Sequence, residues 1–257
     1  MRPTIETLTF DLVDDICLGL EGGALSLAQI PSCKANSIGP FFELNQIIDG
    51  ANCGAIECSA YRDLVMAKAN RRSSWFQDNQ GFIQVESLLL DDLAWNDFSI
   101  RASRAAQAAG FSKDESWKLT AAIGEIYGNV VDHSERTETG YIVYATRGNI
   151  FEFVVADSGI GVLQSLQKNP AYSHIADSGT ALEYALSEGV SRLQAPGHGF
   201  GFQPVFVGLA NISTLVRFRS GDYGRELQRS GDGSIPATTK QLSTIGGLFC
   251  SVLCTSS

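Results

Sequence analysis

The sequence predicts an α+β fold, because segments with helical spacing come first and segments that suit antiparallel strands follow. Two helices are expected between residues 97 and 133, a pair of strands between 141 and 156, and more strands after 212. This order differs from the alternating β-α-β series of a doubly wound nucleotide-binding fold. We therefore expect two layers, a mixed sheet covered on one face by helices.

Local signals delimit the two expected helices. The first, over Asp97–Ala109, is followed by Gly110, a residue type that suits the position after a helix end. Ser112 and Glu115 have the spacing of a capping box and would start the second helix. Apolar residues then recur at helical spacing, which predicts a buried face consisting of Trp117, Leu119, Ala122, Ile123, Ile126 and Val130.

The remaining elements are predicted from β-branched and apolar runs and from turn residues. Tyr141–Thr146 and Phe151–Ala156 read as two strands of a hairpin, joined across Gly148. Phe82–Leu90 is also rich in residues that favour strands. Further helices are expected at Ala181–Leu186 and Pro204–Ala210, and further strands at Ser213–Arg219, Gly224–Gln228 and Leu248–Leu253.

The first eighty residues differ from the rest of the chain in their pattern of apolar and turn residues. Short apolar runs there are interrupted by Gly22-Gly23, Pro31, Gly39-Pro40 and Gly50, which are turn residues. No motif or repeat is evident in this part. We therefore divide the chain into an amino-terminal region over residues 1–80, of unknown role, and a second region over residues 81–257.

Composition and charge exclude several classes of function. Of the 257 residues, 44% are hydrophobic and 18% are charged, with a formal net charge of −9. Such a balance is typical of a folded protein and argues against binding to a nucleic-acid backbone, which requires clustered Lys and Arg. No apolar run reaches the roughly 20 residues that span a bilayer. The chain also lacks the pattern of a secretory signal, so we expect a cytoplasmic protein.

The six cysteines do not form a metal-binding pattern. Cys53 and Cys58 are close in sequence, but no second Cys or His pair would complete a zinc site. Cys250 and Cys254 lie in an apolar run and are expected to be buried as small hydrophobic residues. Cys17 and Cys33 belong to no motif.

The first candidate chemical motif lies on the second helix. Glu125, Asn129 and His133 are spaced four residues apart, so they share one face of the helix. An amide oxygen can ligate magnesium, and a carboxylate can take a proton from an attacking nucleophile. A polar, solvent-facing stripe would show the same spacing.

The second motif is an apolar strand that runs into Asp157, Gly159 and Gly161. An Asp at a strand end can accept a hydrogen bond from an exocyclic amine such as that of adenine, and glycines let the backbone approach a ligand closely. A simple tight turn with Asp as a turn residue would look the same.

The third motif places Gly197, Gly199 and Gly201 before an expected helix. Backbone N–H groups of such a loop can surround phosphate oxygens at a helix N-terminus. The spacing differs from the dinucleotide fingerprint and from the lysine-bearing P-loop.

In this order, the three motifs resemble the N, G1 and G2 boxes of the GHKL ATPase superfamily, over about residues 82–254. The first box is most similar to that of bacterial anti-sigma-factor serine kinases. The resemblance implies a two-layer GHKL sandwich that binds ATP and Mg²⁺. It gives Asn129 as the magnesium ligand and Glu125 as the general base or the group that orients the attacking group. Asp157 would be the adenine partner with Gly159 and Gly161 beside it, and the phosphate loop would consist of Gly197, Gly199 and Gly201.

The resemblance further implies that residues 162–196 form a lid over the nucleotide, and Arg192 in that segment could reach a phosphate. One departure concerns the threonine that many relatives carry before the last strand. Here Thr244 is displaced and Ile245-Gly246-Gly247 occupies the stretch. The purpose of residues 1–80 stays open.

The resulting expectation is an ATPase or a protein serine/threonine kinase in bacterial signalling. The alternative is an ATP-dependent switch with little turnover that binds a protein partner through its lid or its amino-terminal region. A protein partner is expected in either case, and a homodimer is compatible with the sequence. A methyltransferase reading fits less well, because Leu163 stands where its loop usually has a third glycine.

Overall fold

A six-stranded sheet forms the centre of the protein. The computed structural model describes residues 73–91, 93–186, 209, 212–230 and 236–256. The sheet order is β1-β2-β3-β4-β6-β5, and every pairing among the described residues is antiparallel. The predicted α+β class is thus confirmed, whereas the prediction of a mixed sheet was wrong. The strands are β1 (Ser74–Gln77), β2 (Gln80–Gln84), β3 (Tyr141–Arg147), β4 (Ile150–Ala156), β5 (Ser213–Gln228) and β6 (Ala237–Thr255).

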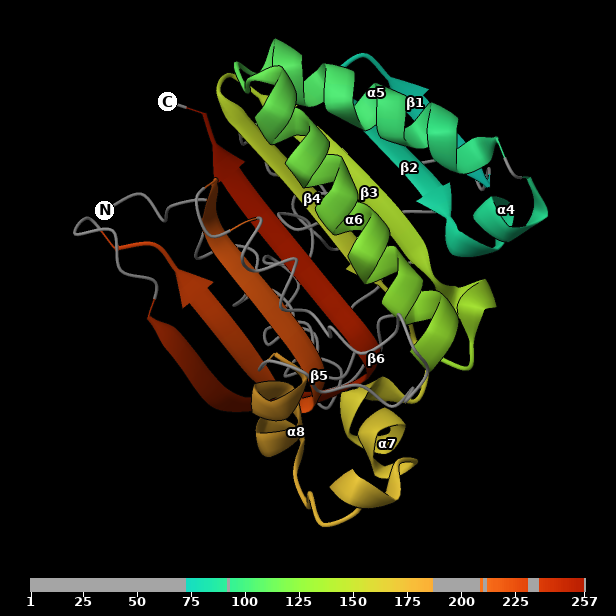
Figure 1. Cartoon of the computed structure of the whole chain (residues 1–257), viewed down its shortest axis with the longest axis vertical. Coiled ribbons are helices and arrows are strands. Elements are labelled where there is room, and N and C mark those ends of the chain that lie inside the picture. The colour runs from blue at the N-terminus through green and yellow to red at the C-terminus, as the bar shows by residue number, and fades with distance from the viewer. Residues whose placement is uncertain (1–72, 92, 187–208, 210–211, 231–235, 257) are drawn as a thin grey trace, which may run out of the picture.

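Two long helices, α5 (Ala94–Ala108) and α6 (Lys113–His133), lie side by side across one face of the sheet (Figure 1). Their apolar side chains form one core with alternate strand residues such as Phe153 and Val252. The shorter helices α7 (Gly161–Gln167) and α8 (Ser178–Ala185) lie at one end of the sheet. The predicted layering of helices on a sheet is therefore present.

Side chains on the opposite face of the sheet are buried as well. Phe82, Val143, Val154 and Leu253 point away from the helices and are at most 5% exposed. Within the described part of the chain, helices contribute to the core on the α5–α6 face only.

The segment predicted as a single strand over Phe82–Leu90 is divided between two elements. β2 ends at Gln84, and α4 (Val85–Leu90) follows directly. Val85 and Leu88 are buried, whereas Leu89 and Leu90 are exposed. The apolar run thus has helical spacing in its second half, and propensity alone did not distinguish the two. The predicted boundary between residues 80 and 81 falls at the start of β2, whose partner β1 belongs to the same sheet.

The hairpin of β3 and β4 is confirmed, with Arg147 paired to Ile150 and Gly148 at φ +57° in the turn. The later strands are longer than predicted. β5 covers both predicted segments and folds back on itself near Gly221, which has φ +61°. Arg229 N donates to Thr214 O at 3.0 Å across this fold.

The sequence signals at the start of α6 are confirmed. Ser112 and Glu115 form a complete capping box, and Gly110 has the left-handed φ of +95° expected after a helix end. Trp117 is the exception, because its side chain is 62% exposed instead of buried. Two short 3-10 helices, η2 (Thr137–Thr139) and η3 (Pro170–Tyr172), complete the described elements.

Several other predictions can be placed. The helix expected at Ala181–Leu186 is α8, which begins three residues earlier. Cys250 and Cys254 are buried free thiols, as expected. Of the helix expected at Pro204–Ala210, only Leu209 is described, and it is buried; the four cysteines before residue 60 lie outside the described residues. No helix among the described residues is long and apolar enough to cross a membrane.

Candidate functional site

Asp157 lies directly after β4, and the fold holds its carboxylate in the interior. Its backbone N–H donates to Leu248 O at 2.9 Å, so pairing with β6 continues one residue beyond the strand. The side chain is 3% exposed, and its Oδ1 accepts a hydrogen bond from Gly159 N at 2.7 Å. Burial raises the pKa of Asp157 to about 6, although the backbone amides of Gly159 and Leu248 oppose that shift.

The glycine at position 159 is required by packing against the end of α6. A Cβ on Gly159 would lie 2.1 Å from Ser134 O, which is a backbone atom. The same carbonyl accepts a hydrogen bond from Ile160 N at 3.0 Å. The loop after β4 therefore sits directly on the carboxy-terminal end of the helix that bears the first motif. Gly161 has φ +75°, a conformation that favours glycine.

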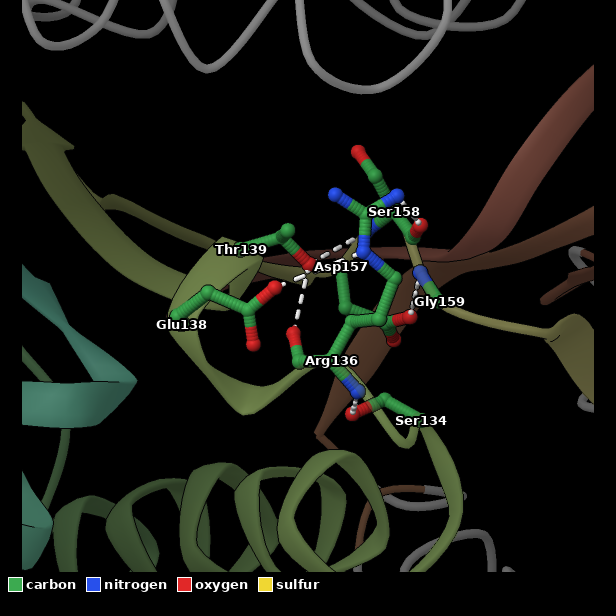
Figure 2. Close-up of polar contacts among 7 residues, drawn as sticks. All are labelled: Ser134, Arg136, Glu138, Thr139, Asp157, Ser158 and Gly159. Atoms are coloured by element: carbon green, nitrogen blue, oxygen red, sulfur yellow. Dashed lines mark hydrogen bonds and ion pairs between the residues drawn. The ribbon is translucent and has the colours of Figure 1, made fainter.

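The segment after α6 supplies further contacts to this loop (Figure 2). The Thr139 hydroxyl accepts a hydrogen bond from Ser158 N at 2.9 Å and donates one to Arg136 O at 2.7 Å. The Arg136 guanidinium donates to Ser158 O at 3.4 Å and pairs with Glu138 at the same distance. Two residues that the motifs did not include, Thr139 and Arg136, thus contact the backbone beside Asp157.

The opposite side of the Asp157 loop rests on β6 and β5. Gly247 has φ +74°, and a Cβ there would lie 2.1 Å from Asp157 O and 2.6 Å from its Oδ1. The Ser220 hydroxyl donates to Gly247 O at 2.8 Å and accepts from Val162 N at 2.9 Å. The glycine pair inside an apolar strand was a signal that could have identified Gly247. Ser220 carries no such signal. We call this set of contacts around Asp157 the Asp157 junction.

Glu125 and Asn129 lie on the flank of α6 that faces away from α5. Tyr127 stacks on Trp95 of α5 with ring centroids 5.5 Å apart. Two residues along an α-helix correspond to a rotation of about 200°, so Glu125 and Asn129 point to the other side. β6 and β5 lie on that side of α6 (Figure 1). The predicted sharing of one face by these residues fits the structure of the helix.

The two side chains of this flank differ in exposure. Glu125 is exposed, and Asn129 is partly buried. Asn129 Nδ2 donates to Glu125 O at 2.9 Å, which leaves the amide oxygen available as a ligand. One amide oxygen suits magnesium, because this ion is held mostly by phosphate oxygens and water with only one or two protein ligands.

The first two motifs meet at one end of the sheet. Ser134 contacts the loop after β4 directly, and Asn129 precedes it by five residues, or roughly 7.5 Å along the helix axis. Glu125 lies about 6 Å farther along the same axis. The Asp157 junction thus adjoins the carboxy-terminal end of α6, and Asn129 and then Glu125 follow at increasing distance along that helix.

The third motif is not placed. Gly197, Gly199, Gly201 and Arg192 lie outside the described residues. The first part of the expected lid is described, and it forms α7, η3 and α8. Val162, Leu166 and Leu182 of this part belong to the hydrophobic core. This portion is therefore packed against the sheet.

A carboxylate has about four acceptor positions on its two oxygens, so Asp157 can receive an additional donor besides the backbone amides. The residues present therefore fit an amine-bearing base next to Asp157 and a metal-bound phosphate next to Asn129. A scan against protein-family models gave no match, and a search of curated proteins gave none either.

Proposed function

We propose that the chain is an ATP-binding protein of the GHKL type, which uses magnesium-ATP as an ATPase or a protein serine/threonine kinase. A single observation carries the proposal: the buried Asp157 carboxylate is joined through Ser134 and Ile160 to the end of the helix that bears Asn129 and Glu125. This connection supports a site in which Asp157 would recognise the base and Asn129 would hold the metal-bound phosphate. The finer assignment of the sheet and helices to a GHKL sandwich belongs to the same proposal.

Each residue has a role that follows from its chemistry. Asp157 accepts the exocyclic amine of adenine, while the lack of a side chain at Gly159 keeps the loop close to α6. Asn129 supplies an oxygen to magnesium. Bound magnesium would neutralise charge on the phosphates and orient them for transfer. Glu125 accepts the proton of the attacking hydroxyl or water. Gly197, Gly199 and Gly201 remain the proposed phosphate loop.

The ionised carboxylate is the stronger acceptor for the amine, because protonation converts one oxygen into a donor, and this gives the proposal a pH dependence. Since burial raises the pKa of Asp157 to about 6, the affinity for ATP should increase as the pH rises through about 6 and level off above about 7. An exposed Asp would give this increase near its ordinary value of about 4.

The test is calorimetric titration of the full chain with ATP at pH 7.5, with and without Mg²⁺. We expect wild-type protein to bind ATP, Asp157→Asn to lose most of the affinity, and Asn129→Ala to lose the dependence on Mg²⁺. In Asp157→Asn the amide oxygen would stay engaged by Gly159 N, and the amide nitrogen that replaces the second oxygen is a donor, which cannot accept the amine. An Asp114→Asn variant, changed in the exposed first turn of the same helix, is the matched control. Absence of ATP binding by the wild type would refute the proposal.

A second function is favoured by the unequal exposure of the two groups. The Asp157 junction is complete within the fold, whereas Glu125 is exposed. A protein that binds ATP and changes its affinity for a protein partner needs the junction and Asn129 but not Glu125. This catalytically weak switch is the alternative proposal, and turnover by the Glu125 variant discussed below separates the two.

A further inference from the structure

We infer that Thr139 is a positioning residue for this nucleotide site, because its hydroxyl holds the backbone on which the Asp157 carboxylate is oriented. The inference rests on the proposed function. Thr139 belongs to η2 and is 5% exposed, and it lies between the end of α6 and the loop after β4 (Figure 2). No motif on α6 or after β4 includes it.

Five backbone amides between residues 157 and 162 donate hydrogen bonds that hold the loop after β4. Two of these amides bind other backbone carbonyls, and one binds the Asp157 carboxylate itself. Two others bind hydroxyl groups from other parts of the chain. The donor–acceptor pairs are Asp157 N to Leu248 O, Ser158 N to Thr139 Oγ1, Gly159 N to Asp157 Oδ1, Ile160 N to Ser134 O, and Val162 N to Ser220 Oγ.

The contact made by Thr139 is adjacent in the chain to the Asp157 carboxylate. Ser158 N belongs to the peptide unit that follows Asp157, so a rotation of that unit also turns the Asp157 carbonyl and shifts the Gly159 amide. The hydroxyl uses both of its functions, because it also donates to Arg136 O at 2.7 Å. Thr139 therefore connects the loop to the segment after α6. This connection fixes the position of the Asp157 motif relative to the motif on α6.

The neighbouring arginine adds a weaker contact to the same peptide. Arg136 Nη1 donates to Ser158 O at 3.4 Å, and its side chain is 57% exposed. A long exposed contact of this kind contributes little compared with a buried hydrogen bond of 2.9 Å. The inference therefore concerns Thr139, and an Arg136→Gln variant should change binding less than Thr139→Val does.

Three variants isolate the hydroxyl. Thr139→Val has nearly the same shape and lacks both hydrogen bonds, whereas Thr139→Ser keeps the hydroxyl and should restore function. Thr120→Val is the matched control, because Thr120 is 6% exposed and its hydroxyl bonds only to carbonyls of its own helix. Both valine variants remove a buried threonine hydroxyl, but only one of the two hydroxyls contacts the loop.

The measurements are affinity for ATP and GTP by calorimetry and amide hydrogen exchange by NMR, all on the full chain. We expect Thr139→Val to weaken ATP binding roughly tenfold, as follows from losing one buried hydrogen bond, and to reduce the preference for ATP over GTP. Exchange of the Ser158 amide should become faster. Thr139→Ser and Thr120→Val should retain the wild-type affinity and preference.

The possible failures are distinguishable. If the wild type binds no nucleotide, the proposed function fails, and the inference fails with it. If the wild type binds ATP and Thr139→Val binds it equally well with an unchanged preference, the inference alone is overturned. An equal loss of affinity in Thr120→Val would also overturn it, since the effect would then reflect general destabilisation.

Discussion

The Asp157 junction and the Glu125–Asn129 flank of α6 are built in opposite ways. In the junction, backbone groups and buried hydroxyls contact one another. The backbone passes so close to Gly159 and Gly247 that a Cβ on either residue would lie 2.1 Å from a backbone oxygen. On the flank, Asn129 contacts a carbonyl of its own helix at 2.9 Å, and Glu125 is exposed. One region is fixed by the tertiary structure, and the other is a helix surface.

The difference separates the residue proposed to recognise the base, Asp157, from the residues proposed to act at the phosphates, Asn129 and Glu125. The buried carboxylate of Asp157 costs stability, because its pKa is raised to about 6 by burial. Exposed side chains on a helix cost little and can be changed without loss of the fold. Substitutions in the junction should therefore change both folding and binding, whereas substitutions on the flank should change magnesium dependence or turnover and leave folding intact.

The largest effect is expected for Gly159→Ala. The added Cβ would meet Ser134 O at 2.1 Å, and neither backbone segment can move without breaking the Ile160 N hydrogen bond. We expect the free energy of unfolding to fall by about 3 kcal/mol or more, with loss of ATP binding. Urea denaturation measures the first quantity.

Gly128→Ala is the control for that variant. No atom lies within 4 Å of the Cβ position at Gly128, which is inside α6. This substitution should stabilise the protein by roughly 0.5–1 kcal/mol. Equal effects of the two substitutions would contradict the packing of the loop on α6.

The second effect is catalytic and concerns the flank. Glu125→Gln should reduce turnover by about 100-fold, equivalent to about 2.7 kcal/mol in the activation free energy, because a general base is lost. ATP affinity and urea stability should remain within error of the wild type. Asp114→Asn, in the exposed first turn of the same helix, should retain turnover. Wild-type turnover near zero, with ATP binding intact, would favour the switch.

The third effect is an increase in the free energy of unfolding when a residue of the proposed binding site is substituted. The pKa of Asp157 in the folded protein, about 6, exceeds the ordinary 3.8, so its contribution to stability is complete below about pH 4 and is lost as the pH rises through about 6. Asp157→Asn should therefore unfold with a free energy on the order of 2 kcal/mol higher than wild type at pH 8.

That advantage should disappear at pH 4, where both side chains are neutral. Urea denaturation of the wild type and Asp157→Asn at these two pH values makes the comparison. If Asp157→Asn is no more stable than the wild type at pH 8, the carboxylate is not buried as described.

The smallest effect lies outside both regions. Ser112 caps α6 by accepting from Glu115 N at 3.2 Å, and Glu115 Oε2 accepts from Ser112 N at 2.8 Å. Ser112→Ala should lower the free energy of unfolding by about 1 kcal/mol and leave the affinity for ATP unchanged. A large change in affinity would mean that the two ends of α6 are coupled and would weaken the distinction between the regions.

Local chemistry in the sequence was sufficient to predict several features of the described structure. The capping box at Ser112, the left-handed Gly110 and the β3–β4 hairpin depend on neighbouring residues, and all three are present. The α+β class followed from the order of such segments. The spacing of Glu125 and Asn129 also fixed their common flank, because a helix has a constant rotation per residue.

Only the tertiary structure decided which segments far apart in sequence would meet. Spacing does not reveal that Thr139 and Ser220 each accept a backbone amide of the loop after β4, or that Gly247 adjoins Asp157. The antiparallel neighbours of β4, the helical turn at Val85–Leu90 and the exposure of Trp117 were likewise set by packing. Local patterns fix the backbone over a few residues, whereas burial depends on which surfaces the whole chain brings together.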